Sequence, residues 1–332
     1  MISRISYLTT DCLNPYRNLA IEEYLRQTVA DNELIFFLWQ NKNTVVVGRN
    51  QNARSECNLA LLEAEGGRLA RRLSGGGAVF HDLGNLNFTF VAHDANYSVT
   101  RQLAVIIRAF NALGINAEQT GRNDIITEGR KCVGNAFLSK DGTNCHHGSI
   151  LYDVKMADLS RYLTVNKQKL QAKGVQSVRS RVINLKEINP NLTLNELQNS
   201  LNSAFREEYA LPCANYTFSA EAEEKITALA EFFASDDYRF GKDIAFGYEL
   251  SHRFAWGEIQ IQIQVGPRTV KQAQIFSDAM EPDLIASLSE LLIGCKIDND
   301  AFASAIEKAA VKNNNEQIII NELTAWLRNP NA

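Results

Sequence analysis

The chain has 332 residues, of which 45% are hydrophobic and 22% charged, and its formal net charge is -4. This length allows one large or two ordinary domains, and the slightly acidic balance argues against a broad basic surface for nucleic acid. No apolar run reaches the length of a membrane span, and the amino terminus lacks a signal-peptide pattern. We therefore expect a cytoplasmic protein with no nucleic-acid or membrane partner. Six cysteines without CxxC spacing predict reduced thiols and no disulfide framework.

The amino-terminal part of the chain alternates helix and strand signals. Asn14-Pro15 is typical of a helix start, and that helix should reach about residue 29. Apolar segments 33–39 and 44–47, separated by polar residues, predict a β-hairpin. A short helix near 57–65 should end at the glycine pair that follows it.

Residues 71–82, with the sequence RRLSGGGAVFHD, are the most unusual stretch. Three consecutive glycines bury almost nothing, and glycine is favoured where the backbone takes a positive φ or approaches a ligand closely. Arg71 and Arg72 provide planar, permanently charged groups suited to phosphate or carboxylate, and the apolar residues 78–80 could form a supporting strand. The alternative is a solvent-exposed turn with two surface arginines.

A strand is expected at 86–91 and an amphipathic helix at 103–113. Beyond them, segments 121–126, 130–137 and 145–152 are separated by glycine-containing turns. We interpret these three segments as adjacent antiparallel strands whose polar residues face one cleft.

Two charged residues in these strands have both structural and chemical interpretations. Lys131 either reaches the surface or points into a site, where its ammonium could neutralise a carboxylate and the phosphate that this carboxylate attacks. Asp124 could hold a nucleotide-bound Mg²⁺ or accept a hydrogen bond from a base, or it could be a local backbone acceptor.

Other reactive side chains carry weaker signals. Cys145, His146 and His147 match no zinc spacing, and consecutive strand residues face opposite sides, so we expect His147 to be a polar cleft residue and no metal cage here. Cys132 and Cys145 have no obvious paired base beyond the histidines. His81 and Asp82 are adjacent, and adjacent residues rarely face each other as an acid–base pair.

The later part of the chain is expected to be mostly helical. Segment 167–181 is cationic and lacks an apolar stripe, which indicates either a solvated surface or a lid over an anion. Helices at 194–209 and 220–233 would complete the first domain. A strictly alternating strand at 259–265 and helices at 284–292, 301–310 and 318–327 predict a small α+β module with no chemical cluster.

Several of these motifs together resemble the lipoate–protein ligase A family. The resemblance is carried by residues 71–85, 121–124, 130–131, 134–137, 146–148 and 173–182, and it runs nearly end to end. It implies an α+β catalytic domain of the biotin/lipoyl ligase type, with mixed and antiparallel sheets flanked by helices, over residues 1–245. Residues 246–332 would form a small α+β accessory domain.

The resemblance also implies a two-step reaction. Lipoate and MgATP would give lipoyl-AMP and pyrophosphate, and the lipoyl group would then pass to a lysine of an acceptor domain. The implied acceptors are the E2 subunits of 2-oxoacid dehydrogenases and the glycine cleavage H protein, and the ligase itself would be a monomer. ATP and Mg²⁺ would be the cofactors and lipoate the substrate.

The resemblance assigns roles residue by residue. Lys131 would be the catalytic lysine and would touch both the lipoyl carbonyl region and the α-phosphate. ATP and adenylate contacts would be Arg72, Gly77, Ala78, Val79, Phe80, Asn123 and Asp124. Lipoate contacts would be Arg71, Ser74, Gly75, Gly76 and His147, and the lid would contain Lys173, Ser177, Arg179 and Arg181. Any Mg²⁺ would arrive with the nucleotide and could touch Asp124. The Cys132-Val133 pair departs from the small or polar residues expected after the lysine.

Two alternative functions remain open from the sequence, and a third is disfavoured. An ATP-independent octanoyl- or lipoyl-transferase of the same fold would act through a cysteine thioester. A non-catalytic lipoate or adenylate sensor would bind without turnover. A DNA-binding regulator is disfavoured, because an amino-terminal helix-turn-helix is missing. The sequence leaves open the acceptor, the choice between lipoate and octanoate, and the base for acceptor attack.

Overall fold

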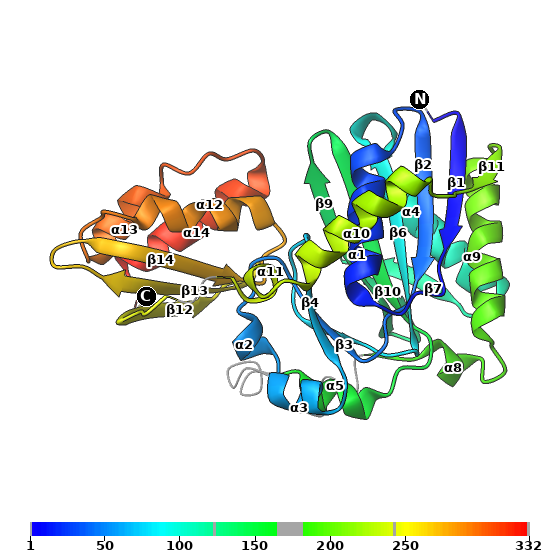
Figure 1. Cartoon of the computed structure of the whole chain (residues 1–332), viewed down its shortest axis with the longest axis horizontal. Helices are drawn as coiled ribbons and strands as arrows, with labels where there is room; N and C mark the ends of the chain where they lie inside the picture. The colour runs from blue at the N-terminus through cyan, green and yellow to red at the C-terminus, as the bar shows by residue number, and fades with distance from the viewer. Residues whose placement is uncertain (1, 122–123, 165–181, 242–243, 331–332) are drawn as a thin grey trace. The chain divides into compact units, whose positions relative to one another are not determined.

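The computed structural model describes residues 2–121, 124–164, 182–241 and 244–330 (Figure 1). By contacts the chain divides into two compact units. The first contains Met1–Val46, Ser55–Ala70 and Val79–Arg239, and the second contains Val47–Arg54, Arg71–Ala78 and Phe240–Ala332. The glycine-rich segment therefore groups with the carboxy-terminal residues, and the domain boundary at residue 245 stays a prediction.

An eight-stranded mixed sheet forms the centre of the first unit. Its order is β11-β1-β2-β6-β10-β9-β8-β7. The strands are β1 (Arg4–Thr9), β2 (Glu33–Trp39), β6 (Asn85–His93), β7 (Ala117–Thr120), β8 (Asp124–Thr127), β9 (Arg130–Lys140), β10 (Thr143–Leu151) and β11 (Cys213–Asn215). β1 runs parallel to β2 and β11, and the other pairs are antiparallel, including the predicted neighbours β8, β9 and β10.

Helices cover both faces of this sheet. The helices of the first unit include α1 (Pro15–Thr28), α3 (Leu59–Ala64), α4 (Val99–Ala112), α5 (Met156–Tyr162), α8 (Leu185–Ile188), α9 (Leu194–Tyr209), α10 (Ala220–Ala234) and the short 3-10 helix η1 (Asp94–Asn96). α1 packs on β2, β6 and β10 with α10 beside it, and α4 packs with α9 (Figure 1). Two short helices, α2 (Ala53–Glu56) and α11 (Asp236–Phe240), lie where the chain passes between the units.

The face toward α4 and α9 forms the apolar core of the first unit. Phe36 of β2 stacks on Phe90 of β6 with ring centroids 4.3 Å apart, and both rings contact Phe205 of α9. All three side chains are fully buried. Complete burial of such a side chain contributes about 1.5–3 kcal/mol, so this face anchors the sheet.

Local signals at the ends of helices act as predicted. Asn14 accepts a hydrogen bond from the Tyr16 amide at 3.0 Å, and Pro15 is the first residue of α1. α3 ends before Gly66, whose φ of 73° is the left-handed conformation that glycine favours, and the Gly67 amide donates to the Leu62 carbonyl. Caps of this kind depend only on neighbouring residues, which is why sequence reasoning finds them.

The predicted hairpin between segments 33–39 and 44–47 is wrong. β2 pairs with β1 and β6, whereas β3 (Thr44–Val47) lies between β4 (Arg68–Arg71) and β5 (Val79–His81) in a separate three-stranded sheet. Both faces of β2 are buried, so this strand is central and needs two neighbours from elsewhere in the chain. The buried Asn18 amide binds the Gln40 carbonyl and the Asn41 side chain, and so holds the turn that leads into β3.

The second unit contains a three-stranded antiparallel sheet and three helices. The strands are β12 (Tyr248–Arg253), β13 (Glu258–Val265) and β14 (Val270–Ser277), and the helices are α12 (Pro282–Leu292), α13 (Asn299–Ile306) and α14 (Asn314–Arg328). Ile259, Ile261 and Ile263 of β13 are fully buried with the helix residues Leu288 and Leu323. The alternation of β13 and the small α+β module are therefore confirmed, as is the predicted fold class.

None of the six cysteines, all of which the structure describes, forms a disulfide, as predicted. Among the described helices, none combines the length and the apolar composition needed to cross a membrane.

A buried histidine marks the core side of β10. The ring nitrogens of His146 lie 2.9 Å from the side-chain oxygens of Gln102 and of Asn135, and the side chain is fully buried. Burial, with a smaller contribution from His147, lowers the pKa of His146 from 6.5 to about 3. The folded protein therefore holds this ring neutral where the unfolded chain would protonate it.

This difference predicts a stability that falls with acidification. Between about pH 6.5 and the folded pKa of about 3, only the unfolded chain binds the extra proton, so the free energy of unfolding decreases as the pH falls. At about pH 5 the loss relative to neutral pH should be about 2 kcal/mol, from 1.36 kcal/mol for each pKa unit. Urea unfolding of the wild type and of His146→Gln at neutral pH and at about pH 5 measures this decrease in unfolding free energy. An equal decrease in the two proteins would contradict its assignment to His146.

Candidate active site

The sheet face toward α1 carries polar side chains in two rows, which we call the polar face. Residues paired in register point to the same side of a sheet. The first row runs across five strands and contains Trp39, Asn87, Ser149, Gly134 and Asp124. The second row contains Phe37, Thr89, His147 and Ala136. Asp124 of β8 and His147 and Ser149 of β10 thus lie on one face, as predicted, whereas His146 of β10 lies on the opposite, core face.

Lys131 and Asp124 form an ion pair at one end of the first row. The Lys131 ammonium nitrogen lies 2.6 Å from Asp124 Oδ1, and the two side chains keep 37% and 35% of their surface exposed. A Cβ at Gly134 would stand 3.1 Å from Lys131 Cε and 3.2 Å from Nζ. The lysine therefore extends along the polar face over Gly134, half-buried.

A β-bulge gives Lys131 this direction. Ile125 pairs with Val133, but the next residue, Ile126, pairs with Lys131, so Cys132 is an extra residue in β9. Without the bulge, Lys131 and Gly134 would face opposite sides because they are three residues apart. Cys132 instead turns to the core, where its thiol donates to the Ile125 carbonyl at 3.4 Å. The unusual residue after the lysine is the bulged one.

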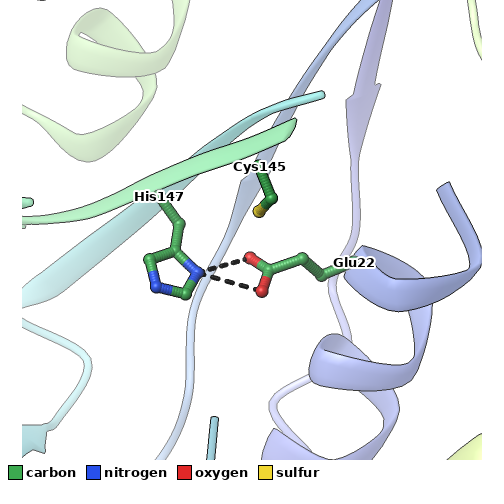
Figure 2. A group of neighbouring side chains, drawn as sticks. All are labelled: Glu22, Cys145 and His147. Atoms are coloured by element: carbon green, nitrogen blue, oxygen red, sulfur yellow. Dashed lines mark hydrogen bonds and ion pairs between the residues drawn. The ribbon is translucent and has the colours of Figure 1, made fainter. Parts of the chain in front are cut away.

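A second cluster joins α1 to β10. His147 Nδ1 lies 2.9 Å from both carboxylate oxygens of Glu22, and Cys145 stands beside them on the same strand (Figure 2). The Thr89 hydroxyl donates to Glu22 Oε2 at 2.7 Å, and Trp39 Nε1 donates to the Thr89 hydroxyl at 3.0 Å. The cluster thus extends from the second row of the polar face into α1.

Sequence reasoning identified His147 but missed Glu22. The signal in the sequence is a carboxylate three residues from both Leu19 and Leu25, inside the buried stripe of α1. A charge in such a stripe needs a partner, because an unpaired buried charge is costly. The partner lies more than a hundred residues along the chain, so the stripe predicts that a partner exists without naming it.

The electrostatics of this cluster keep the carboxylate charged and the thiol protonated. Burial by itself would raise the pKa of Glu22, but the His147 ring and the hydrogen bonds from His147, Thr89 and Cys145 together lower it. Burial, then the charges of Glu22 and Glu23, raises the pKa of the Cys145 thiol well above 9. Burial also raises the pKa of Cys132 to about 12. Neither cysteine is an activated nucleophile at neutral pH.

Asn87 is a buried donor in the first row. Its side chain is 1% exposed, and among the described residues its Nδ2 has no hydrogen-bond partner. Buried polar groups are normally paired. The unpaired amide next to Trp39 and Ser149 is therefore open to an acceptor from outside the described residues, a water or a bound molecule.

In the second unit the glycine-rich segment curls around an arginine. Arg72 Nη2 donates to the carbonyls of Gly75 and Gly77, both at 2.8 Å, and Nε donates to the Ser74 hydroxyl at 3.1 Å. Gly76 has a φ of 89°. The segment is a shaped loop, and the solvent-exposed turn of the alternative interpretation does not describe it, since Arg72 and Ser74 are buried.

The glycines of this loop differ in what surrounds them. A Cβ at Gly75 would lie 2.2 Å from the Ala279 carbonyl oxygen, so close packing requires glycine there. Among the described residues, no atom lies within 4 Å of such a Cβ at Gly77. Gly77 is therefore the position at which a ligand could approach the backbone.

Arg71 has a structural environment. Its Nη1 donates to the carbonyls of Gly48, Arg49 and Gln51 at 2.8–3.0 Å, and the side chain is buried. Asp82 likewise accepts from the Gly84 and Lys155 amides. Both side chains thus hold loop backbone in position.

The remaining predicted site residues divide into two groups. Ala78 ends the glycine-rich segment, and Val79, the first residue of β5, pairs with Val46 of β3. The buried Phe80 contacts the Tyr162 ring, with ring centroids 4.9 Å apart. Asn123, Lys173, Ser177, Arg179 and Arg181 lie outside the described residues.

Comparison with known proteins identifies the family of the chain. Residues 14–206 match the lipoyl protein ligase A/B catalytic domain, and residues 243–327 match the bacterial lipoate protein ligase C-terminus. The crystal structure of P. falciparum LipL1 in complex with lipoate is 28% identical in sequence, with a TM-score of 0.84 over 97% of this chain and 99% of that chain.

Two further structures cover the larger part of the chain. A bi-partite lipoate protein ligase from Thermoplasma acidophilum, described with its E2 lipoyl domain, is 25% identical, with a TM-score of 0.65 over 74% of this chain and 99% of that chain. A lipoate-protein ligase A bound with ATP shares the fold at 24% identity and a TM-score of 0.63, over 73% and 99% of the two chains. Since the catalytic-domain match spans more than half of the chain and includes the strands β8, β9 and β10 that carry Asp124, Lys131 and His147, the protein belongs to the lipoyl protein ligase A/B family.

Proposed function

We propose that this protein is an ATP-dependent lipoate–protein ligase. It joins lipoate to AMP with release of pyrophosphate and then transfers the lipoyl group to a lysine of an acceptor domain, such as an E2 subunit or the glycine cleavage H protein. The observation that carries the proposal is the Lys131–Asp124 pair, extended over Gly134 on the polar face. The relatives that hold lipoate, hold ATP or act with an E2 lipoyl domain support the same reaction.

In the first step an oxygen of the lipoate carboxylate attacks the α-phosphorus of ATP, and pyrophosphate leaves. Two anions must approach each other, and the Lys131 ammonium would reduce their repulsion and stabilise the charge that develops at phosphorus. Asp124 keeps the ammonium in place before the substrates bind. Its carboxylate is also suited to hold Mg²⁺ together with nucleotide phosphates, and the ion would neutralise phosphate charge.

The substrate contacts are proposed for the same residues that the family pattern assigns. Lipoate would meet Ser74, Gly75, Gly76 and His147 with Lys131, and Arg71 would act by holding the backbone beside this loop. The adenylate would meet Arg72, residues 77–80, Asn123 and Asp124. Segment 173–181 would cover the adenylate, which water destroys. Asn87 is a further donor available to the bound substrates.

Replacing Lys131 by alanine should impair the first step. Wild type should exchange labelled pyrophosphate into ATP only when lipoate is present, and Lys131→Ala should lower that rate about 10²–10³-fold, the usual effect of removing one stabilising group. Lys140→Ala is the matched control, because Lys140 is an exposed lysine of the same strand. An exchange rate equal to that of the wild type in Lys131→Ala would contradict the assigned role.

The same material tests the alternative functions. An ATP-independent transferase would modify an isolated E2 lipoyl domain from a lipoyl or octanoyl thioester without ATP, and would show no pyrophosphate exchange. A non-catalytic binding protein would show neither reaction. Modification of the lipoyl domain with lipoate and ATP, and none with ATP omitted, is the result that the ligase proposal requires.

A substitution under the lysine provides a second prediction. Gly134→Ala places a methyl group against Lys131 Cε and Nζ and should shift the ammonium by a few tenths of an ångström. Because misplacement by about 1 Å can lower a rate 10²-fold, a loss of about tenfold in lipoyl-AMP formation is expected. Gly247→Ala is the control, since a Cβ there meets no atom of the described residues within 4 Å. Equal rates for the two variants, with both folded, would argue against the position of the ammonium.

A further inference from the structure

We propose that Glu22, Cys145 and His147 form a binding site for a soft divalent cation such as Zn²⁺. One ligand atom from each residue lies within 4.8 Å of the other two, and all three side chains are buried. In Figure 2 the carboxylate of Glu22 and the thiol of Cys145 lie on the same side of the His147 ring nitrogen Nδ1. We call these three residues the Glu–Cys–His cluster.

The donor set fits zinc chemistry. Zn²⁺ takes thiolate sulfur, imidazole nitrogen and carboxylate oxygen, and sites with three protein ligands keep a fourth position open. Bond lengths of about 2.0–2.3 Å place tetrahedral ligand atoms about 3.5 Å apart. His147 Nδ1 and the Glu22 oxygens lie 2.9 Å apart, and the three ligand atoms lie within 4.8 Å of one another. Side-chain shifts of about 1 Å, which widen the shorter separation and narrow the longer ones, would give tetrahedral spacing around an ion.

The fold holds two of the ligands on one rigid element. Cys145 and His147 are two residues apart on β10, a strand with neighbours on both sides, so their side chains point to the same face. His146 between them points to the core and binds Gln102 and Asn135. The consecutive Cys-His-His pattern therefore contributes two ligands, and α1 supplies the third, Glu22, from the facing layer.

Neighbouring hydrogen bonds already orient the carboxylate. Thr89 donates to Glu22 Oε2, and Trp39 donates to Thr89. Groups of this kind around a metal site fix the direction of its ligands and raise affinity. Oε1 of Glu22 remains directed toward the ring of His147.

Charge balances when the ion binds. A zinc–sulfur bond forms as the Cys145 thiol releases its proton to solvent, and His147 coordinates through Nδ1 as a neutral ring that carries its one proton on Nε2. Thiolate and carboxylate together neutralise the two positive charges of the ion, so the buried cluster with its ion is neutral. Under the proposed function, an ion beside His147 would compete with lipoate and inhibit the ligase.

Metal binding by the full-length, reduced protein tests the proposal without any activity assay. Zn²⁺ titrated against a chromophoric chelator should bind with one strong equivalent and release protons. Co²⁺ should give a thiolate-to-metal charge-transfer band. Cys145→Ser and Glu22→Gln should each lower the zinc affinity at least 100-fold, and Cys145→Ser should abolish the cobalt charge-transfer band. Thr89→Val should weaken zinc binding by about 10–100-fold.

Cys132→Ser is the matched control, because Cys132 is a buried cysteine of the neighbouring strand whose thiol faces the core. It should bind zinc as the wild type does. Zinc should also raise the unfolding temperature of the wild type and of Cys132→Ser, but not of Cys145→Ser. Circular dichroism identifies any variant that does not fold, and Glu22→Gln preserves the side-chain shape.

Two results would overturn the proposal. The first is a folded wild type that binds no strong equivalent of Zn²⁺. The second is a strong equivalent and a charge-transfer band that survive in Cys145→Ser, which would locate the metal elsewhere. Neither result depends on whether the protein is a ligase, because pyrophosphate exchange tests that separately.

Discussion

The large sheet has an apolar face, which forms the core, and a face that carries polar side chains, and the rest of the structure depends on keeping the two apart. Successive side chains of β2, β6 and β10 point to opposite faces of the sheet. Those that stack with Phe36 and Phe90 therefore face α4 and α9, while those of the polar face meet α1. A slip of one residue in any of these strands would exchange the two sets. The buried Glu22–His147 pair adds to this constraint, since removing one partner of a buried pair costs about 3–5 kcal/mol.

The backbone of β9 sets the direction in which the Lys131 side chain points. The bulge at Cys132 turns Lys131 to the side of Asp124, and the absence of a side chain at Gly134 leaves room for the ammonium above the strand. Bulges commonly redirect side chains next to active sites. A half-buried ammonium held by one carboxylate can exchange that partner for another anion more readily than a fully buried pair could.

The glycine-rich segment uses its charges differently from a simple anion-binding turn. Arg71 and Arg72 donate to carbonyl oxygens of their own neighbourhood and so fix the path of the backbone. Of the glycines, Gly75 is required by close contact with Ala279, whereas a Cβ at Gly77 would meet no described atom within 4 Å. The glycines of one short motif thus serve the shape of the loop differently.

Features that depend on nearby residues could be derived from the sequence alone. They include the caps of α1 and α3, the alternation of β13, the antiparallel β8, β9 and β10, and the ordered motifs that indicated a lipoate ligase. Only the tertiary structure decided that β2 and β3 belong to different sheets, that Cys132 is bulged, and that Glu22 meets His147. The physical reason is that strand pairing, bulges and buried ion pairs join residues far apart in the chain, and their energies depend on neighbours that no local window contains.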